Sequence, residues 1–426
     1  MKRFIYFFAI LFFLFIFDYT YAETLDLSGE AAILIDYDTN EILYEKNSHL
    51  ELYPASTTKM MTAILAVENS ELDELVTIDD EIVSLTYGSH IALEPGEVLT
   101  MEQLLHAMLL PSANDAALAI AKHVGGTIDN FVSMMNQRAV ELGANDTNFV
   151  NPNGLHDDNH VSSAYDLALI GKEAMEHEQI RNIVNTVQYE IPPTNKKTES
   201  RYFKITNKLL YDSELINVDG KLISTKYPYA SGVKTGYTSN AKNCLVAYAN
   251  KADQKLISVV LKADGINVYA DTHKLLNYGF ENFNNIIIAN SNEFIDNISI
   301  TDGDTPYIAG ILDRNIVYPM SEFNQNNIEK KITIREDLKA PIDKGQIIGE
   351  AEYLIDGKVI GGGNIISTAA VLIDPDTTTF GKIKNNWYLF IFLIAILLRI
   401  YTLALRRKRK KMKSRQTIYR MPYNAK

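Results

Sequence analysis

The sequence predicts an α+β fold for the larger, N-terminal part of this chain, then a small all-β domain and a C-terminal transmembrane helix. Three observations support this prediction. β-rich runs near residue 31 and after residue 230 enclose a long stretch with helical periodicity. Short β runs between Gly, Asp and Pro turns fill residues 286–373, and an apolar segment lies near the C-terminus. The 426 residues are enough for two domains with a sizeable core.

The first segment, Met1 to Ala22, has the pattern of a secretory signal peptide. Two basic residues precede an uncharged apolar run from Phe4 to Phe17, and small residues follow where cleavage would occur. As a helix the run would span about 21 Å, short of the roughly 30 Å hydrocarbon layer. We therefore expect a cleaved signal at residues 1–22 and an exported protein.

Residues 23–284 carry the α+β pattern. Two β-rich runs joined by a polar turn predict an antiparallel hairpin, and Thr100 with Gln103 fits a capping box for a helix that Pro111 ends. The expected elements are strands at 31–36 and 41–45, helices at 56–68, 100–109 and 115–123, strands at 232–235, 243–249 and 256–261, and a helix at 271–278.

The remaining residues divide into an all-β domain at 285–373, a polar linker at 374–386, a transmembrane helix at 387–405 and a basic tail at 406–426. A helix over the apolar segment would span about 28 Å. The basic tail predicts a cytoplasmic C-terminus with the body outside the membrane. A basic amphipathic helix lying on the membrane is the alternative, but no polar face runs through Tyr388 to Leu398.

The charge distribution limits the kinds of molecule that this protein is expected to bind, and the cysteine content limits its disulfides. Without the two terminal segments, residues 23–386 hold 28 basic and 52 acidic residues, a formal net charge of −24. Such a body would repel phosphates, so nucleic acid is not an expected partner. The basic tail could touch anionic lipid, although a topology signal alone explains it. The single cysteine, Cys244, excludes an intramolecular disulfide and reads as a buried apolar thiol.

Three short clusters predict an acyl-transfer site: Ser56-Thr57-Thr58-Lys59, Ser112-Ala113-Asn114 and Lys234-Thr235-Gly236. A single Ser-x-x-Lys tetrapeptide is expected by chance roughly once or twice in a chain of this length. Their occurrence together, in this order, is much more specific. They supply a nucleophilic hydroxyl, two lysines, a second hydroxyl and a strand edge for a substrate backbone.

The first two clusters provide the reacting groups. Ser56 at a helix N-terminus is the expected nucleophile, and Lys59, three residues later on the same face, is the expected general base. A buried lysine near another cation can have its pKa lowered enough for that role. Ser112 would relay a proton to the leaving amine, and the Asn114 amide would bind both Lys59 and the substrate.

The third cluster provides substrate contacts. Lys234 is the expected second cation, and the Thr235 hydroxyl would bind a substrate carboxylate. Gly236 would keep the strand edge open so that a peptide or lactam can lie alongside. The N–H of Tyr237 would complete an oxyanion hole with that of Ser56.

These clusters resemble those of the serine D-alanyl-D-alanine carboxypeptidases, which are low-molecular-mass penicillin-binding proteins with the penicillin-recognising serine transpeptidase/β-lactamase-like fold. Further similar stretches are Pro152-Asn153-Gly154-Leu155, His160-Val161-Ser162-Ser163-Ala164, Thr206-Asn207-Lys208-Leu209-Leu210 and, in the β-rich part, Leu338-Lys339-Ala340-Pro341-Ile342. The resemblance implies removal of the terminal D-alanine from peptidoglycan stem peptides through an acyl-enzyme on Ser56, acylation by β-lactam antibiotics, and no cofactor.

Two departures from that family matter. Its members usually carry an arginine that helps hold the substrate carboxylate, and residues 262–271 contain none. Lys262 is the expected substitute, although a point charge matches a carboxylate less well than a guanidinium. The second departure is the anchor, which is an amphipathic helix in many relatives and a membrane-spanning one here.

Other interpretations stay open at this point. A D,D-endopeptidase or a β-lactamase could share the clusters, although the Glu-x-x-x-Asn from Glu178 to Asn182 is poorly placed for a deacylating base. A non-catalytic penicillin-binding or wall-binding protein is the third alternative. His156 and His160 have a spacing that a metal could use, but they follow Asn-Gly in a loop, and we expect no metal there.

Overall fold

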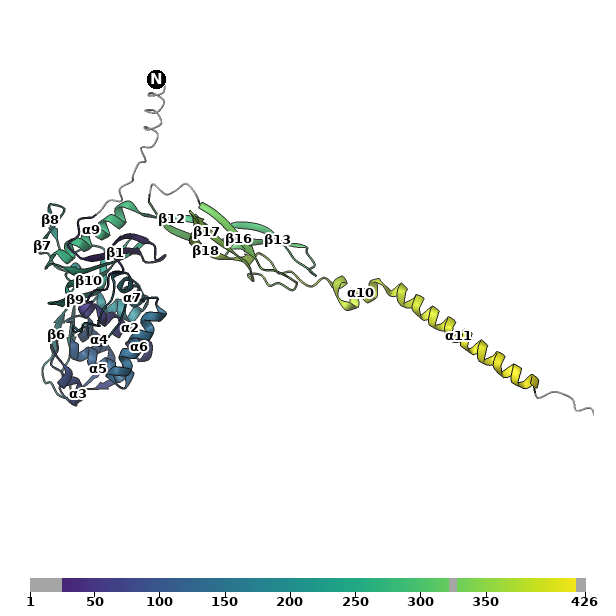
Figure 1. Cartoon of the computed structure of the whole chain (residues 1–426), viewed down its shortest axis with the longest axis horizontal. Coiled ribbons are helices and arrows are strands. Elements are labelled where there is room, and N and C mark those ends of the chain that lie inside the picture. The colour runs from purple at the N-terminus through teal and green to yellow at the C-terminus, as the bar shows by residue number, and fades with distance from the viewer. Residues whose placement is uncertain (1–24, 322–327, 419–426) are drawn as a thin grey trace, which may run out of the picture. The chain divides into compact units, whose positions relative to one another are not determined.

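The computed structural model describes residues 25–321 and 328–418, so the expected signal peptide at residues 1–22 lies outside the described residues. The chain divides into two compact units. The first runs to Ile286 and includes a short segment that begins at Pro319, and the second holds the remainder. Figure 1 follows the chain from the first unit to the C-terminal helix.

The first unit is built on an antiparallel sheet with strand order β2-β1-β11-β10-β9. These strands are β1 (Ala31–Asp36), β2 (Ile42–Lys46), β9 (Ala230–Thr238), β10 (Lys242–Lys251) and β11 (Gln254–Ala263). Strands from the two ends of the unit therefore lie side by side, and β1 pairs with β11 from Ala31 opposite Leu261 to Asp36 opposite Leu256.

Both faces of this sheet are buried because alternate residues point to opposite sides. One face, which includes Ile33 and Val259, packs against the large helical layer, and the other, which includes Leu34 and Val260, packs against α9. The helices are α2 (Lys59–Asn69), α3 (Asp80–Leu85), α4 (Met101–Leu109), α5 (Asn114–Gly125), α6 (Ile128–Glu141), α7 (Ala164–Glu176), α8 (Glu178–Val184) and α9 (Asn267–Asn282). Thr100 forms the expected capping box with Gln103 at the start of α4.

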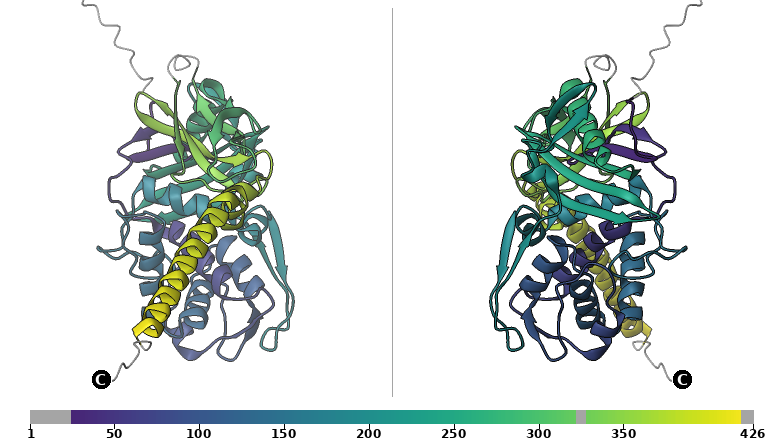
Figure 2. Two further views of the ribbon diagram at one scale, coloured as in Figure 1. Left: turned by 90° about the vertical axis from the view of Figure 1, so that its right-hand side faces the viewer. Right: turned by 90° about the vertical axis from the view of Figure 1, so that its left-hand side faces the viewer.

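Three two-stranded hairpins or pairs complete the first unit. They are β3 (Leu75–Thr77) with β4 (Val98–Thr100), β5 (Gln188–Ile191) with β6 (Arg201–Lys204), and β7 (Leu215–Val218) with β8 (Lys221–Ser224). The β5–β6 hairpin, teal in Figure 2, runs along the outer edge of the helical layer. The buried Glu97 carboxylate holds it there through an ion pair of 2.6 Å with Arg201.

The second unit confirms the expected all-β domain. Its main sheet is antiparallel with order β13-β14-β18-β17-β16, and β12 pairs with β15. The strands are β12 (Asn284–Ala289), β13 (Phe294–Ser299), β14 (Tyr307–Leu312), β15 (Ile316–Met320), β16 (Ile328–Ile334), β17 (Ile347–Ile355) and β18 (Lys358–Ser367).

Residues 374–386, expected as a polar linker, contain a 3-10 turn η3 (Pro375–Thr377) and a short helix α10 (Thr379–Asn385). Helix α11 (Trp387–Ile418) follows and continues past the apolar segment into the basic residues. Within the described part of the chain, one helix, over Trp387–Met412, is long and apolar enough to cross a membrane.

Candidate active site

Ser56 lies in a 3-10 turn, η1 (Ala55–Thr58), which leads directly into α2 at Lys59. The sequence predicted an α-helix that begins at Ser56, so the expectation was correct for Lys59 but not for the nucleophile's own backbone. The tighter turn places Ser56 just ahead of the helix, while Lys59 is fully buried. Ser56 itself keeps partial access to solvent.

The Lys59 amine has three partners. Its Nζ atom lies 3.1 Å from Ser56 Oγ, 2.7 Å from Asn114 Oδ1 and 2.6 Å from the carbonyl oxygen of Asn153. Burial lowers the pKa of Lys59 well below its ordinary value, and the nearby Lys234 lowers it further. A neutral amine has two N–H groups for the two carbonyl-type acceptors, so its lone pair is left to face the Ser56 hydroxyl. This arrangement would allow Lys59 to accept the proton of the Ser56 hydroxyl.

Asn114 is held from several sides. Its backbone N–H donates to Ser89 O at 2.7 Å and its Nδ2 donates to Tyr87 O at 2.5 Å. The neighbouring Asp115 carboxylate is buried and accepts the N–H groups of Ile91 and Leu93. The loop at residues 87–93 is therefore fixed against the start of α5, which orients the amide oxygen toward Lys59.

Ser112 lies in the break between α4 and α5, as the sequence predicted. Its backbone is left-handed, with φ of 65°. Its hydroxyl is buried, and it has no hydrogen-bond partner among the described residues. Its proton-relay role thus remains a prediction, and the free hydroxyl leaves it available to a substrate.

Strand β9 brings the third cluster against Ser56. A Cβ added to Gly236 would lie 2.9 Å from Pro54 O and 3.1 Å from Ser56 N, so only glycine allows this approach. Burial lowers the pKa of Lys234 to about 7, and its Nζ donates to Thr235 O at 3.0 Å. The Tyr237 side chain is exposed.

The Thr235 hydroxyl has a partner that the sequence did not predict. Its Oγ1 lies 2.6 Å from Oγ1 of Thr206, and both hydroxyls face solvent. Thr206 precedes the 3-10 turn η2 (Lys208–Leu210). The stretch around it had been noted only as a similarity, without a role for any side chain.

The loop that contains Asn153 and Gly154 was also missed as part of the site. Gly154 has φ of +80°, and a Cβ there would lie 1.9 Å from Ala55 O and 3.0 Å from Ser56 N. The loop backbone therefore packs directly on the nucleophile's turn while the Asn153 carbonyl accepts from Lys59. An Asn-Gly pair is a recognisable turn signal, but it does not reveal which carbonyl will face the active site.

The two loop histidines have structural partners. His160 Nδ1 accepts the Val150 N–H at 3.1 Å, which leaves Nε2 to donate to Thr58 Oγ1 at 2.8 Å. His156 Nε2 lies 2.7 Å from Asn240 Nδ2. Burial lowers the pKa of His160 to about 4, so the ring is neutral at pH 7. Both ring nitrogens of His160 are in use, which fits the expectation that this pair is not a metal site.

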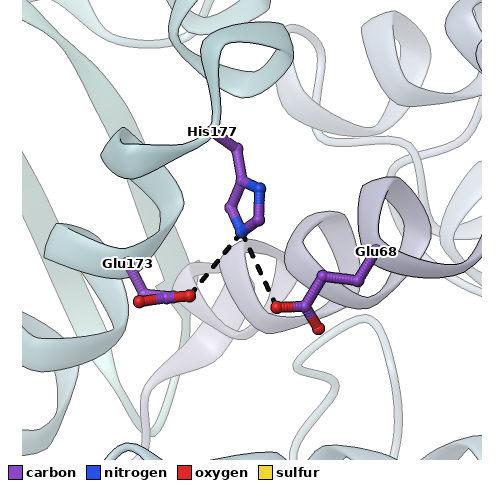
Figure 3. Close-up of side chains that lie close together, drawn as sticks. All are labelled: Glu68, Glu173 and His177. Atoms are coloured by element: carbon purple, nitrogen blue, oxygen red, sulfur yellow. Dashed lines mark ion pairs between the residues drawn. The ribbon is translucent and has the colours of Figure 1, made fainter.

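A separate cluster joins Glu68, Glu173 and His177 (Figure 3), from the ends of α2 and α7. His177 Nε2 lies 3.7 Å from Oε1 of Glu68 and 3.7 Å from Oε1 of Glu173. The same two oxygens lie 2.7 and 2.6 Å from Nη2 of Arg138 on α6. The guanidinium is thus already paired with both carboxylates, and the cluster is an ion-pair network that ties three helices together.

The Lys262 amine already has an acidic partner. It lies on β11, which β10 separates from β9, and its Nζ forms an ion pair of 2.7 Å with Glu30. This partner argues against the expectation that Lys262 substitutes for the missing arginine.

Comparison with family models matches both units. The model described as D-alanyl-D-alanine carboxypeptidase, peptidase family S11, matches residues 18–265, and the model of the penicillin-binding protein 5 C-terminal domain matches residues 283–372.

Known proteins give the same result. D-alanyl-D-alanine carboxypeptidase DacF of Bacillus subtilis is 33% identical over 377 residues, which cover 86% of this chain and 92% of that protein. DacA of Escherichia coli K12 is 30% identical, with 84% and 86% covered. The crystal structure of penicillin-binding protein 5 from Haemophilus influenzae matches with a TM-score of 0.66 at 28% identity, over 83% of this chain and 100% of that one. The chain belongs to the serine D-alanyl-D-alanine carboxypeptidase family and has its penicillin-binding-protein fold.

Proposed function

We propose that Ser56 is the residue through which this D-alanyl-D-alanine carboxypeptidase cleaves its substrate, by way of an acyl-enzyme. The observation that carries this assignment is the position of the Lys59 amine, 3.1 Å from Ser56 Oγ with two carbonyl-type acceptors for its N–H groups. A serine hydroxyl needs such a base, and a lysine with a lowered pKa can act as one.

The reaction has two halves. Lys59 takes the Ser56 proton as Oγ attacks the carbonyl of the penultimate D-alanine, and the N–H groups of Ser56 and Tyr237 stabilise the oxyanion. Ser112 passes the proton from Lys59 to the amine of the terminal D-alanine, the C–N bond breaks, and that residue leaves with Lys59 neutral again. Lys59 then deprotonates a water molecule that hydrolyses the ester and regenerates Ser56.

The substrates in this proposal are peptidoglycan stem peptides that end in D-Ala-D-Ala. β-Lactams would acylate the same serine, because their strained amide can occupy the position of the scissile bond. Lys234, Thr235 and Gly236 would bind the substrate along β9, and Asn114 would contact its backbone.

The same proposal places the enzyme at the cell membrane. Helix α11 would cross it once, with residues 406–426 in the cytoplasm and the catalytic unit outside. The basic residues that follow the apolar segment support this orientation.

The test uses the full chain in detergent. Incubated with a synthetic pentapeptide ending in D-Ala-D-Ala, it should release one D-alanine, which mass spectrometry detects, and Ser56→Ala should release none. Tryptic mapping after treatment with a labelled penicillin should find a stable adduct on Ser56. An adduct on Ser112, or labelling that survives Ser56→Ala, would refute the assignment, and rapid turnover of the penicillin would indicate a β-lactamase.

A further inference from the structure

A pair of exposed hydroxyls marks the rim of the site beside β9. Thr206 Oγ1 and Thr235 Oγ1 lie 2.6 Å apart, which is the distance of a direct hydrogen bond between them. One hydroxyl donates to the other, so one proton of the pair remains free to point outward. If an anion with two oxygens arrives, each hydroxyl can turn and donate to one of them.

Thr206 is held in this position by its backbone. Its N–H donates to Leu110 O at 3.1 Å, and its carbonyl accepts from the Tyr269 hydroxyl at 3.3 Å. The adjacent Asn207 side chain donates to Gly232 O at 2.9 Å. Thr206 is thus tied to the segment before Ser112, to α9 and to β9 itself. A hydroxyl fixed from three elements is preorganised for binding.

The hairpin that leads into Thr206 is also secured. Besides the Arg201–Glu97 ion pair, Asn195 accepts the Val98 N–H at 2.9 Å and donates to Gly96 O at 2.7 Å. Thr194 Oγ1 donates to the same buried Glu97 carboxylate at 2.8 Å. These contacts fix the strand β6. Because Thr206 lies two residues beyond the end of this strand, they also help to fix the position of Thr206.

Four lysines on the neighbouring elements already have polar partners. Lys262 binds Glu30, Lys242 binds Asp264 at 2.8 Å, and Lys208 binds both Asp212 and Glu214 at 3.1 and 2.8 Å. The buried Lys234 directs its Nζ to the Thr235 carbonyl. Each of these cations would have to leave a partner before it could bind a substrate carboxylate.

We propose that Thr206 is a specificity-determining residue of this enzyme, and that its hydroxyl and that of Thr235 together bind the terminal carboxylate of the substrate. This proposal rests on the proposed function and adds the way in which the site recognises a free peptide acid. The carboxylate is bound by two neutral donors where relatives use an arginine. A hydroxyl that donates to a carboxylate is a charge-assisted hydrogen bond, and its loss should weaken binding of the acid selectively.

The experiment compares two peptides on the full chain in detergent, a pentapeptide ending in D-Ala-D-Ala and the same peptide with a terminal carboxamide. Thr206→Val removes the hydroxyl and keeps the branched shape. We expect kcat/KM for the acid to fall roughly fivefold to tenfold, mainly through KM, which corresponds to about 1–1.4 kcal/mol. The value for the amide should change less than about twofold, as for one weak neutral contact.

Four further variants separate a role in carboxylate binding from a structural role. Thr206→Ser keeps a hydroxyl and should restore preference for the acid. Thr77→Val, a matched change on the exposed strand β3, should leave both peptides unaffected. Lys242→Ala and Lys262→Ala should leave the acid-to-amide ratio unchanged.

Several outcomes would overturn the proposal. Equal losses for acid and amide in Thr206→Val would mean that the residue only supports the strand. A Thr206→Ser variant as impaired as Thr206→Val, or a ratio that depends on Lys242 or Lys262 instead, would also refute it. Failure of the proposed function gives a different result, because Ser56→Ala would then still release D-alanine, or the unmodified enzyme would cleave neither peptide.

Discussion

The Lys59 amine approaches the Ser56 hydroxyl to 3.1 Å across the junction of a 3-10 turn and an α-helix. The two residues are three positions apart, so the helical spacing of the turn and the helix puts them on one side. What directs the amine is the pair of oxygens behind it, Asn114 Oδ1 and Asn153 O, because they take its other protons.

Replacing the amine should therefore stop acylation. We expect Lys59→Ala to lose roughly a hundredfold or more in the rate at which a labelled penicillin acylates Ser56, as is typical when a general base is removed. Lys172→Ala, which removes an exposed lysine on α7, serves as the control. Circular dichroism would establish that both variants are folded. Acylation close to the normal rate in Lys59→Ala would contradict the assigned base.

Lys234 should reduce stability in a pH-dependent way. Its pKa is about 7 in the folded state, against an ordinary value of 10.5, because burial disfavours the charge. Between these values the unfolded chain binds more protons, so stability rises with pH through that window. Lys234→Met lacks this penalty, and we expect it to have the higher Tm at pH 7, with a difference that shrinks toward pH 10.

Thermal unfolding of both proteins across this pH range would measure the effect. Each pKa unit corresponds to about 1.4 kcal/mol, so the gain at pH 7 should be on the order of a few kcal/mol. A Tm difference that grows with pH would have the wrong sign and would mean that the buried amine is not the source of the instability.

Gly154 should be intolerant of any side chain. In Gly154→Ala the new Cβ would lie 1.9 Å from Ala55 O, so the nucleophile's turn must move, and we expect acylation to fall by at least about tenfold. Gly220→Ala is a matched control, because Gly220 has a similar φ of +82° but nothing within 4 Å of the added atom. Both variants place an alanine in the left-handed backbone region, which costs roughly 1 kcal/mol of folding free energy.

Labelled-penicillin kinetics and Tm would be measured for both glycine variants. If the two lose activity and stability equally, the backbone conformation alone explains the effect, and the contact with Ala55 is unimportant.

Removal of the C-terminal helix should release the enzyme. A chain truncated after Asn386 lacks α11, and the catalytic groups all belong to the first unit. We expect it to appear in the soluble fraction after ultracentrifugation and to cleave a small pentapeptide with unchanged kcat/KM. A truncated protein that still sediments with membranes would show that α11 is not the anchor.

Local signals in the sequence predicted most of the first unit. The capping box at Thr100 and the break at Pro111 act within a few residues, and both lie where expected. The 3-10 turn at Ser56 could not be predicted this way. Gly154 and Gly236 press on that turn from about a hundred and 180 positions away in sequence, and helix propensity contains no information about such contacts.

The candidate site also contains residues that the sequence could predict and residues that it could not. Side chains with distinctive chemistry, such as Lys59 and Asn114, stood out because few residue types can do their work. The carbonyl groups of Asn153 and Tyr87 did not, since every residue has one and only the fold decides where it points. Thr206 is an intermediate case. Threonine is a common residue, and only its hydrogen bond to Thr235 on the neighbouring strand β9 indicates a role in the site.

The fixed hairpin β5–β6 has a consequence for how such enzymes can change. In the proposed reaction, the residues that make and break bonds lie on η1, at the starts of α2 and α5, and on β9. The Thr206 hydroxyl lies on a separate stretch of chain, which follows the hairpin that Glu97 holds in place. Substitutions in that stretch can alter which acyl donors are accepted while leaving the nucleophile and its base intact. The contribution of Thr206 to selectivity can therefore change, or be engineered, without a change in Ser56 or Lys59.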